Sequence, residues 1–218
     1  MPAYPAKTAF RATLAWVALA CAGHAGAATI TGTVFEDVNY GGGAGRPLSP
    51  TAGTLRVEGA RVEVYNSGGT LQQVLTTDAN GFYSYTYSGH AERRIRVVNG
   101  TVRSERTGGA GCTTCVPVQT YRVEAPAGFN VPAPNEVGGR NPAASDAAQS
   151  NSTMPAGAQS YSVVDPSNSG DTVAGIDFGF NFDVIVNTRD ATNCAPGGAG
   201  NTVFPCQGAL RQFIINAN

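Results

Sequence analysis

Short runs of alternating or β-branched residues, each bounded by Gly, Asn, Asp or Pro, follow one another along most of the chain. Helical periodicity is almost absent from the same region. Both observations are typical of strands joined by turns. The expected fold is therefore all-β, an antiparallel β-sandwich. We expect strands at residues 29–36, 55–57, 61–65, 70–77, 82–87, 94–98, 118–123, 160–164 and 175–182.

Alternation within two of these runs predicts which side chains face the core. In the run 61–65, Val62 and Val64 alternate with Arg61 and Glu63, so we expect the valines inside and the two charged residues in water. The run 94–98 shows the same pattern. The predicted core residues, taken over all the strands, are Phe35, Val62, Val64, Ile95, Val97, Ile176, Phe178 and Phe180.

Asn80-Gly81 separates a Thr-rich strand from an aromatic one. Both residues tolerate the positive φ values that a two-residue type I′ turn requires. The sequence therefore predicts a β-hairpin here.

Two segments depart from the short-strand pattern. Residues 107–157 are rich in Gly, Pro, Ala, Asn and Ser, which predicts a long irregular insertion with one strand in it. Near the end, Leu210, Phe213 and Ile214 have helical spacing, so we expect a short C-terminal helix whose apolar face has no obvious partner. The expected domains are 28–183 for the sandwich and 184–218 for a linker and the start of a further module.

Residues 1–27 have the features of a secretory signal peptide. Lys7 and Arg11 precede an apolar stretch from Leu14 to Ala22, and Ala25-Gly26-Ala27 forms a small-residue exit. The apolar stretch is too short for a membrane-spanning helix, which needs about 20 residues. A second interpretation, lipidation at Cys21, stays open. We expect a secreted or cell-surface protein without a transmembrane segment.

The charge of the chain after residue 27 argues against some partners. It contains 12 arginines, no lysine and 15 acidic residues, a net charge of −3 dispersed along the sequence. Nucleic acids and anionic membranes require a concentrated basic face. We therefore expect neither partner.

Four cysteines remain after the leader: Cys112, Cys115, Cys194 and Cys206. An even number in an exported chain predicts disulfides. Short separation favours Cys112 with Cys115 and Cys194 with Cys206, although four cysteines permit three pairings. A redox centre or half of a zinc site at the Cys-x-x-Cys pair is the alternative.

Tyr83, Tyr85 and Tyr87 share one face of an expected strand. An exposed strip of this kind would suit stacking against sugar rings. Burial of the strip in the core is the favoured interpretation, because aromatic residues prefer buried sheet faces.

No catalytic constellation is visible. His90 is the only histidine after the leader, no Gly-x-Ser-x-Gly sequence occurs, and the acidic residues lie in turns or alternate along strands. We therefore expect no enzymatic activity from this chain and no catalytic residues.

A resemblance to a known family adds to this interpretation. The segments 31–40, 60–65, 76–83 and 176–180 resemble, in order and spacing, the SdrD B-like domains of the Cna B-type, prealbumin-like class of bacterial surface proteins. The segments 184–190 and 208–214 resemble the lead-in to a right-handed parallel β-helix. The family resemblance implies a spacer or adhesin role at the bacterial cell surface or outer-membrane exterior.

Members of the family contain two features that can be sought in this sequence, a calcium-binding loop and an isopeptide bond. Some members bind calcium through an acidic loop, of which Asp37 and Asn39 match two positions, while Gly41 and Leu48 stand where further acidic ligands are expected. A turn capped by Asp37 and Asn39 is the favoured interpretation, and no cofactor is expected. Other members form a lysine isopeptide, which this chain cannot do without a lysine after residue 27.

Three functions follow as hypotheses. The first is a non-catalytic spacer or adhesin module of a larger surface protein. The second is a module that binds an extracellular glycan or protein, through the tyrosine strip or the 107–157 insertion. The third is the N-terminal part of a β-helix enzyme that acts on polysaccharides.

Overall fold

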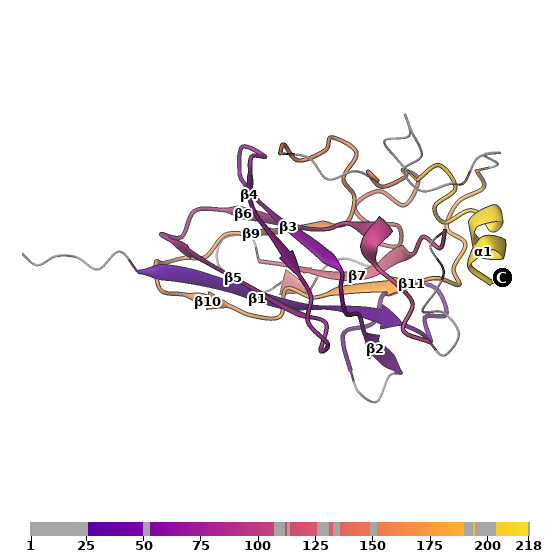
Figure 1. The fold of residues 1–218 in the computed structure, drawn as a ribbon, viewed down its shortest axis with the longest axis horizontal. Coiled ribbons are helices and arrows are strands. Elements are labelled where there is room, and N and C mark those ends of the chain that lie inside the picture. The colour runs from indigo at the N-terminus through magenta and orange to yellow at the C-terminus, as the bar shows by residue number, and fades with distance from the viewer. Residues whose placement is uncertain are drawn as a thin grey trace, which may run out of the picture.

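Two β-sheets packed face to face, with one short helix at the C-terminal end, make up the described part of the computed structural model (Figure 1). It describes residues 26–49, 53–106, 112, 114–125, 131–132, 136–148, 152–189, 194 and 204–217. The expected all-β sandwich and its C-terminal helix are confirmed. Residues 1–25, which include Cys21 and most of the expected 1–27 signal peptide, lie outside the described residues, and Ala27 is already the first residue of a strand.

The larger sheet has seven strands and the smaller has four. The larger contains β1 (Ala27–Asp37), β2 (Thr54–Arg56), β5 (Phe82–Ser88), β7 (Val118–Glu124), β8 (Val131–Pro132), β10 (Thr172–Val173) and β11 (Phe178–Asn181). The smaller contains β4 (Leu71–Thr76), β3 (Arg61–Asn66), β6 (Arg93–Val97) and β9 (Tyr161–Val164), in that spatial order. A 3₁₀ turn covers Asn99–Thr101, and the helix α1 covers Leu210–Ala217.

Strand β1 organises the larger sheet. It pairs antiparallel with β5 along its first half and with β2 at its end, while β10 and β11 pair with it in parallel. Strand β1 begins at one end of the long axis of the molecule, and α1 lies at the other end (Figure 1). The described chain therefore enters and leaves the sandwich at opposite ends.

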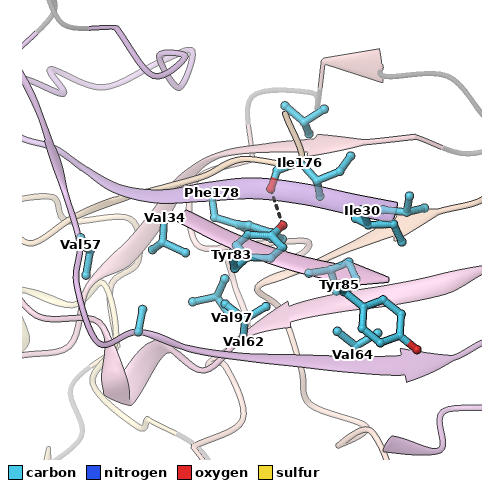
Figure 2. Packing of buried hydrophobic residues seen from close by; sticks show 14 of the residues in the cluster. Ile30, Val34, Val57, Val62, Val64, Tyr83, Tyr85, Val97, Ile176 and Phe178 are labelled. Carbon is cyan, nitrogen blue, oxygen red and sulfur yellow. Dashed lines mark hydrogen bonds between the residues drawn. The ribbon is translucent and has the colours of Figure 1, made fainter. Parts of the chain in front are cut away.

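The core lies between the two sheets and contains most of the predicted residues. Val62, Val64, Ile95, Val97, Ile176, Phe178 and Phe180 are all fully buried in one hydrophobic cluster. Side chains from β1 and β5 meet those of β3 and β6 in this layer (Figure 2). The Tyr83 hydroxyl donates a hydrogen bond of 2.5 Å to the carbonyl of Ile176 within it.

Phe35 is buried but does not belong to that cluster. Its neighbour Val34 takes the core position, so Phe35 points to the other face of β1. There its ring lies 6.1 Å from that of Tyr121, beside Gly179. The predicted burial of Phe35 is confirmed, but Phe35 lies outside the cluster that holds the other predicted core residues, because the larger sheet is covered on both faces at this point.

The prediction that Arg61 and Glu63 face water is wrong for Glu63, which is fully buried, while Arg61 is half-buried. Glu63 accepts hydrogen bonds from Arg96 (2.8 Å), from the Tyr65 hydroxyl (2.6 Å) and from Arg61 (2.8 Å). Arg96 is itself fully buried and donates to the carbonyl of Ala147, at 2.8 Å. Ala147, a described residue of the 107–157 insertion, thus lies over the outer face of the smaller sheet, where Arg96 forms an ion pair with Glu63.

The predicted Asn80-Gly81 hairpin is also wrong, although a turn does form. The Gly81 amide donates to the carbonyl of Asp78, at 2.8 Å, and Gly81 has a φ of +66°. However, β4 pairs with β3 whereas β5 pairs with β1. The turn therefore carries the chain from one sheet to the other.

Candidate functional site

The tyrosine strip lies in the core. Tyr83, Tyr85 and Tyr87 are only 2%, 5% and 8% exposed. Burial raises the pKa of Tyr87 to about 12 and that of Tyr83 well above its usual value. These rings are therefore closed to a sugar ring, and the binding role considered for them is corrected to a packing role.

The two calcium candidates, Asp37 and Asn39, have different neighbours in the structure. The buried carboxylate of Asp37 accepts hydrogen bonds from Arg46, with Nε at 2.9 Å and Nη2 in closer contact. Its Oδ2 lies 3.4 Å from the Arg46 amide. The backbone carbonyl of Asp37 accepts from Asn181 at 2.8 Å. The Arg46 guanidinium thus faces the Asp37 carboxylate, while the Asn39 side chain lies beside Gly53.

The predicted cysteine pairs are both present. Cys112 bonds to Cys115 and Cys194 bonds to Cys206, with Cα separations of 5.4 Å and 5.0 Å. The segments that carry the two bonds lie side by side, because the Gln207 side chain contacts the carbonyl of Pro117. The sulfur of Cys115 lies 4.0 Å from the carbonyl of Asn216 in α1.

The described ranges contain no further cluster of catalytic or metal-binding side chains. His90 is exposed in the turn between β5 and β6. Among the described residues, no group of three or more His, Cys, Asp and Glu side chains could hold a metal ion. The described part of the chain also contains no helix long and apolar enough to cross a membrane.

Helix α1 docks on the sandwich through amide side chains. Asn216 donates to the carbonyls of Phe182 (2.7 Å) and Val116 (3.2 Å), and its oxygen accepts from the Val116 amide. Gln212 is buried and donates to Thr114 at 3.1 Å and to Asn216 at 2.8 Å. The polar side of this helix therefore faces the protein, whereas Leu210 and Ile214 are exposed.

A pocket of about 1030 Å³ lies on the exposed side of α1. Its lining includes three exposed apolar residues, Ile185, Leu210 and Ile214, together with Ile215 and Cys194. Thr114, Asn187, Thr188, Arg189 and Arg211 complete it. A pocket of this size and lining is of the kind that holds a small ligand or a peptide side chain.

A buried polar cluster ties the C-terminal segment to the rest of the protein. Asp146 is fully buried, and its amide donates to Gln207 at 2.7 Å, while its carboxylate accepts from the amides of Ala147 and Gln159. Burial raises the pKa of Asp146 to about 6, against the opposing effect of the Arg96 charge. Gln207 also donates to the carbonyl of Pro117 at 3.0 Å. The insertion, the sandwich and the C-terminal segment therefore meet at one set of hydrogen bonds.

Sequence reasoning identified the helix and the cysteines of this site but missed the pocket. The sequence feature that could have indicated the pocket was the apolar face of the expected helix, for which no packing partner was found. What the sequence did not indicate is that Gln212 and Asn216 would dock the helix, because amides are usually found on exposed positions.

Comparisons with known proteins add little to this description. No model of a protein family matches the chain, and no curated protein matches it. Among solved structures, the Bacillus anthracis TIE protein is similar over 68% of this chain and 33% of its own, at 8% sequence identity and a TM-score of 0.25. The match spans about a third of that protein, and a likeness this weak carries no argument.

Proposed function

We propose that this chain is a non-catalytic spacer module of a larger exported protein. The observation that carries the proposal is the position of the first described strand and of the helix, because β1 begins at one end of the long axis and α1 lies at the other (Figure 1). A module with this layout adds its full length to a protein in which it is inserted. Two disulfides in the described residues support export, since such bonds persist in oxidising compartments.

The pairing of the first and last strands suits a module under tension. Strand β11 runs parallel to β1, with Val34 opposite Phe178 and Glu36 opposite Phe180. Force applied to the start of β1 and to the end of β11 slides these strands along each other. Their hydrogen bonds then share the load, whereas strands peeled apart from one end lose their bonds one at a time.

Single-molecule force spectroscopy tests this proposal. Handles at residues 28 and 217 load β1 and β11 in shear. Handles at residues 28 and 88 pull on the adjoining ends of β1 and β5, where Ala27 lies opposite Ser88, and unzip that pair. We expect a higher unfolding force in the first geometry, because forced unfolding follows the height of the unfolding barrier. Equal forces in the two geometries would contradict a load-bearing role.

A second candidate function, binding, rests on the pocket beside α1. Its exposed apolar residues Ile185, Leu210 and Ile214 are of the kind that mark interaction sites. Arrays of glycans and of peptides, probed with the protein and with a Leu210→Asp variant, test it. Binding that the variant loses would favour this function over the spacer role.

A further inference from the structure

Strands β4 and β5 lie at free edges of their sheets. Strand β4 ends the order β4-β3-β6-β9, and β5 pairs with β1 alone among the described strands. The opposite side of the sandwich is closed, because Ala125 at the end of β7 bridges Val164 in β9. The two edges are consecutive in the chain and are joined by the turn at Asp78–Gly81.

Neither edge strand carries a charge or a proline. Their sequences are Leu-Gln-Gln-Val-Leu-Thr and Phe-Tyr-Ser-Tyr-Thr-Tyr-Ser. Strands β3, β6 and β7, which lie inside the sheets, contain arginines instead. Edge strands of soluble proteins are usually protected by charges, prolines or bulges, since their unpaired backbone groups invite another strand. In this protein the charges lie on inner strands, and the edge strands β4 and β5 have none of the usual protective charges.

Of the two edges, β5 is the more open. The start of β4 is covered, because the Leu71 amide donates to the carbonyl of Ser152 and Thr70 bridges Thr153. A register shift also interrupts the pairing of β4 with β3. Strand β5 alternates strictly between buried tyrosines and the exposed residues Phe82, Ser84, Thr86 and Ser88.

The backbone of β5 shows which groups are available. The Val34 amide donates to Gly81, and in the same register Ile30 lies opposite Tyr85, so the backbone groups of the tyrosines face β1. Those of Ser84, Thr86 and Ser88 therefore point away from the sheet. The backbone of Phe82 is bonded to Asp78. The open segment accordingly runs from Ser84 to Ser88.

We propose that β5 is a self-association site at which two copies of this chain pair antiparallel and join their larger sheets into one. A twofold interface needs a surface that is compatible with itself. An uncharged strand meets this condition, because its own copy brings no like charge opposite it, and Ser and Thr pairs across strands are favourable. Phe82 is 42% exposed at one end of this edge, which adds apolar surface for the partner to cover.

Charge substitution at Ser84 and Thr86 tests the proposal. In a twofold pairing centred near Tyr85 or Thr86, these positions face Ser84, Thr86 or Ser88 of the second copy. We expect the purified wild-type protein to show twice the monomer mass by sedimentation at high concentration. The double variant Ser84→Lys, Thr86→Lys should sediment as a monomer at the same concentration, and so should Ser84→Glu, Thr86→Glu. Mixing the two variants should restore the doubled mass, since opposite charges then face each other.

The matched control carries two lysines elsewhere. Ser167 and Ser169 are exposed between β9 and β10, so Ser167→Lys, Ser169→Lys should dimerise like the wild type. A wild type that stays monomeric at about 1 mM would overturn the proposal, because association would then be too weak to matter. If such a monomer nevertheless bound a peptide with the sequence of residues 81–89, the β5 edge would accept an added strand, but that strand would come from a partner other than a second copy of this chain. A dimer that survives in both charged variants would overturn it as well.

Discussion

Gly32 shows how one residue decides a contact in the core. A Cβ atom at this position in β1 would clash with the backbone carbonyl of Ile176 and would lie 2.6 Å from the Tyr83 hydroxyl. The hydrogen bond between Tyr83 and Ile176 therefore depends on the missing side chain. Its neighbours are backbone and a fully packed ring, which have little freedom to move.

We expect Gly32→Ala to lower the free energy of unfolding by about 3 kcal/mol or more, because overpacking against backbone forces the strands apart. Gly41→Ala is the matched control, since a Cβ there meets nothing within 4 Å. Urea denaturation of both variants measures the difference. Equal stability of the two would show that β1 can shift away from Ile176 without cost.

Asp146 carries a second residue-scale prediction, on pH. Its folded pKa of about 6 exceeds the ordinary value of 3.8 because the carboxyl group is buried, and Oδ2 has no hydrogen-bond partner among the described residues. The folded protein therefore binds this proton more tightly than the unfolded chain. The resulting stability is full below about pH 4 and is lost as the pH rises through 6.

The expected loss between pH 4 and pH 7 is about 2 kcal/mol for this group. Glu36 and Asp177, whose pKa values burial also raises, add to it, while the lowered pKa of Glu124 opposes it. Urea midpoints at pH 5 and pH 7.5 should differ for the wild type and differ much less for Asp146→Asn. An unchanged pH dependence in the variant would locate the effect in the other carboxyl groups.

At the scale of elements, the amide side chains of α1 hold it on the sandwich. Removing Asn216 deletes its bonds to Phe182 and Val116 and leaves the buried Gln212 amide with one partner fewer. We expect Asn216→Ala to loosen the helix by about 1 to 3 kcal/mol, the usual cost of unpaired buried polar groups. Faster proteolysis within residues 204–217 measures it, with Leu210→Ala as the control that keeps these bonds.

The elements also show what the sequence could and could not predict. The alternation of apolar and polar residues located most of the strands and the buried valines, because this alternation is a property of adjacent residues in the sequence. The pairing partner of a strand depends on residues that are distant in sequence. The turn at Asn80-Gly81 was therefore predicted correctly, but the sequence did not reveal that β4 and β5 belong to different sheets. Glu63 was misplaced for the same reason: its buried partner Arg96 and the Ala147 carbonyl that Arg96 contacts are both distant in sequence.

The candidate site was predictable to a similar extent. Cysteine spacing gave both disulfides, since short loops need no knowledge of the fold. The pocket is formed by residues from three separate segments, around Thr114, Ile185 and Leu210, which no local pattern brings together. The tyrosine strip was correctly favoured as core, because burial of an aromatic face follows from the strand itself.

At the scale of the whole molecule, stability divides between the sandwich and its C-terminal end. The hydrophobic cluster joins β1, β3, β5, β6 and β11, and no residue of α1 or of 204–209 belongs to it. The C-terminal segment attaches through amide hydrogen bonds and through Phe204, which is buried beside Gly100. Regions held by few apolar contacts open locally, without unfolding the rest. The C-terminal segment is therefore expected to behave as a separate unit of lower stability.

Replacing Cys194 and Cys206 by serine tests this division. A disulfide closing a loop of this length is worth about 2 to 4 kcal/mol when the loop unfolds with the whole protein. Here we expect the loss to stay local, so hydrogen exchange should rise within residues 204–217 while β1, β3 and β6 keep their protection. The thermal unfolding of the sandwich should change little. A fall in protection across all strands would show that the C-terminal segment and the sandwich unfold as one cooperative unit.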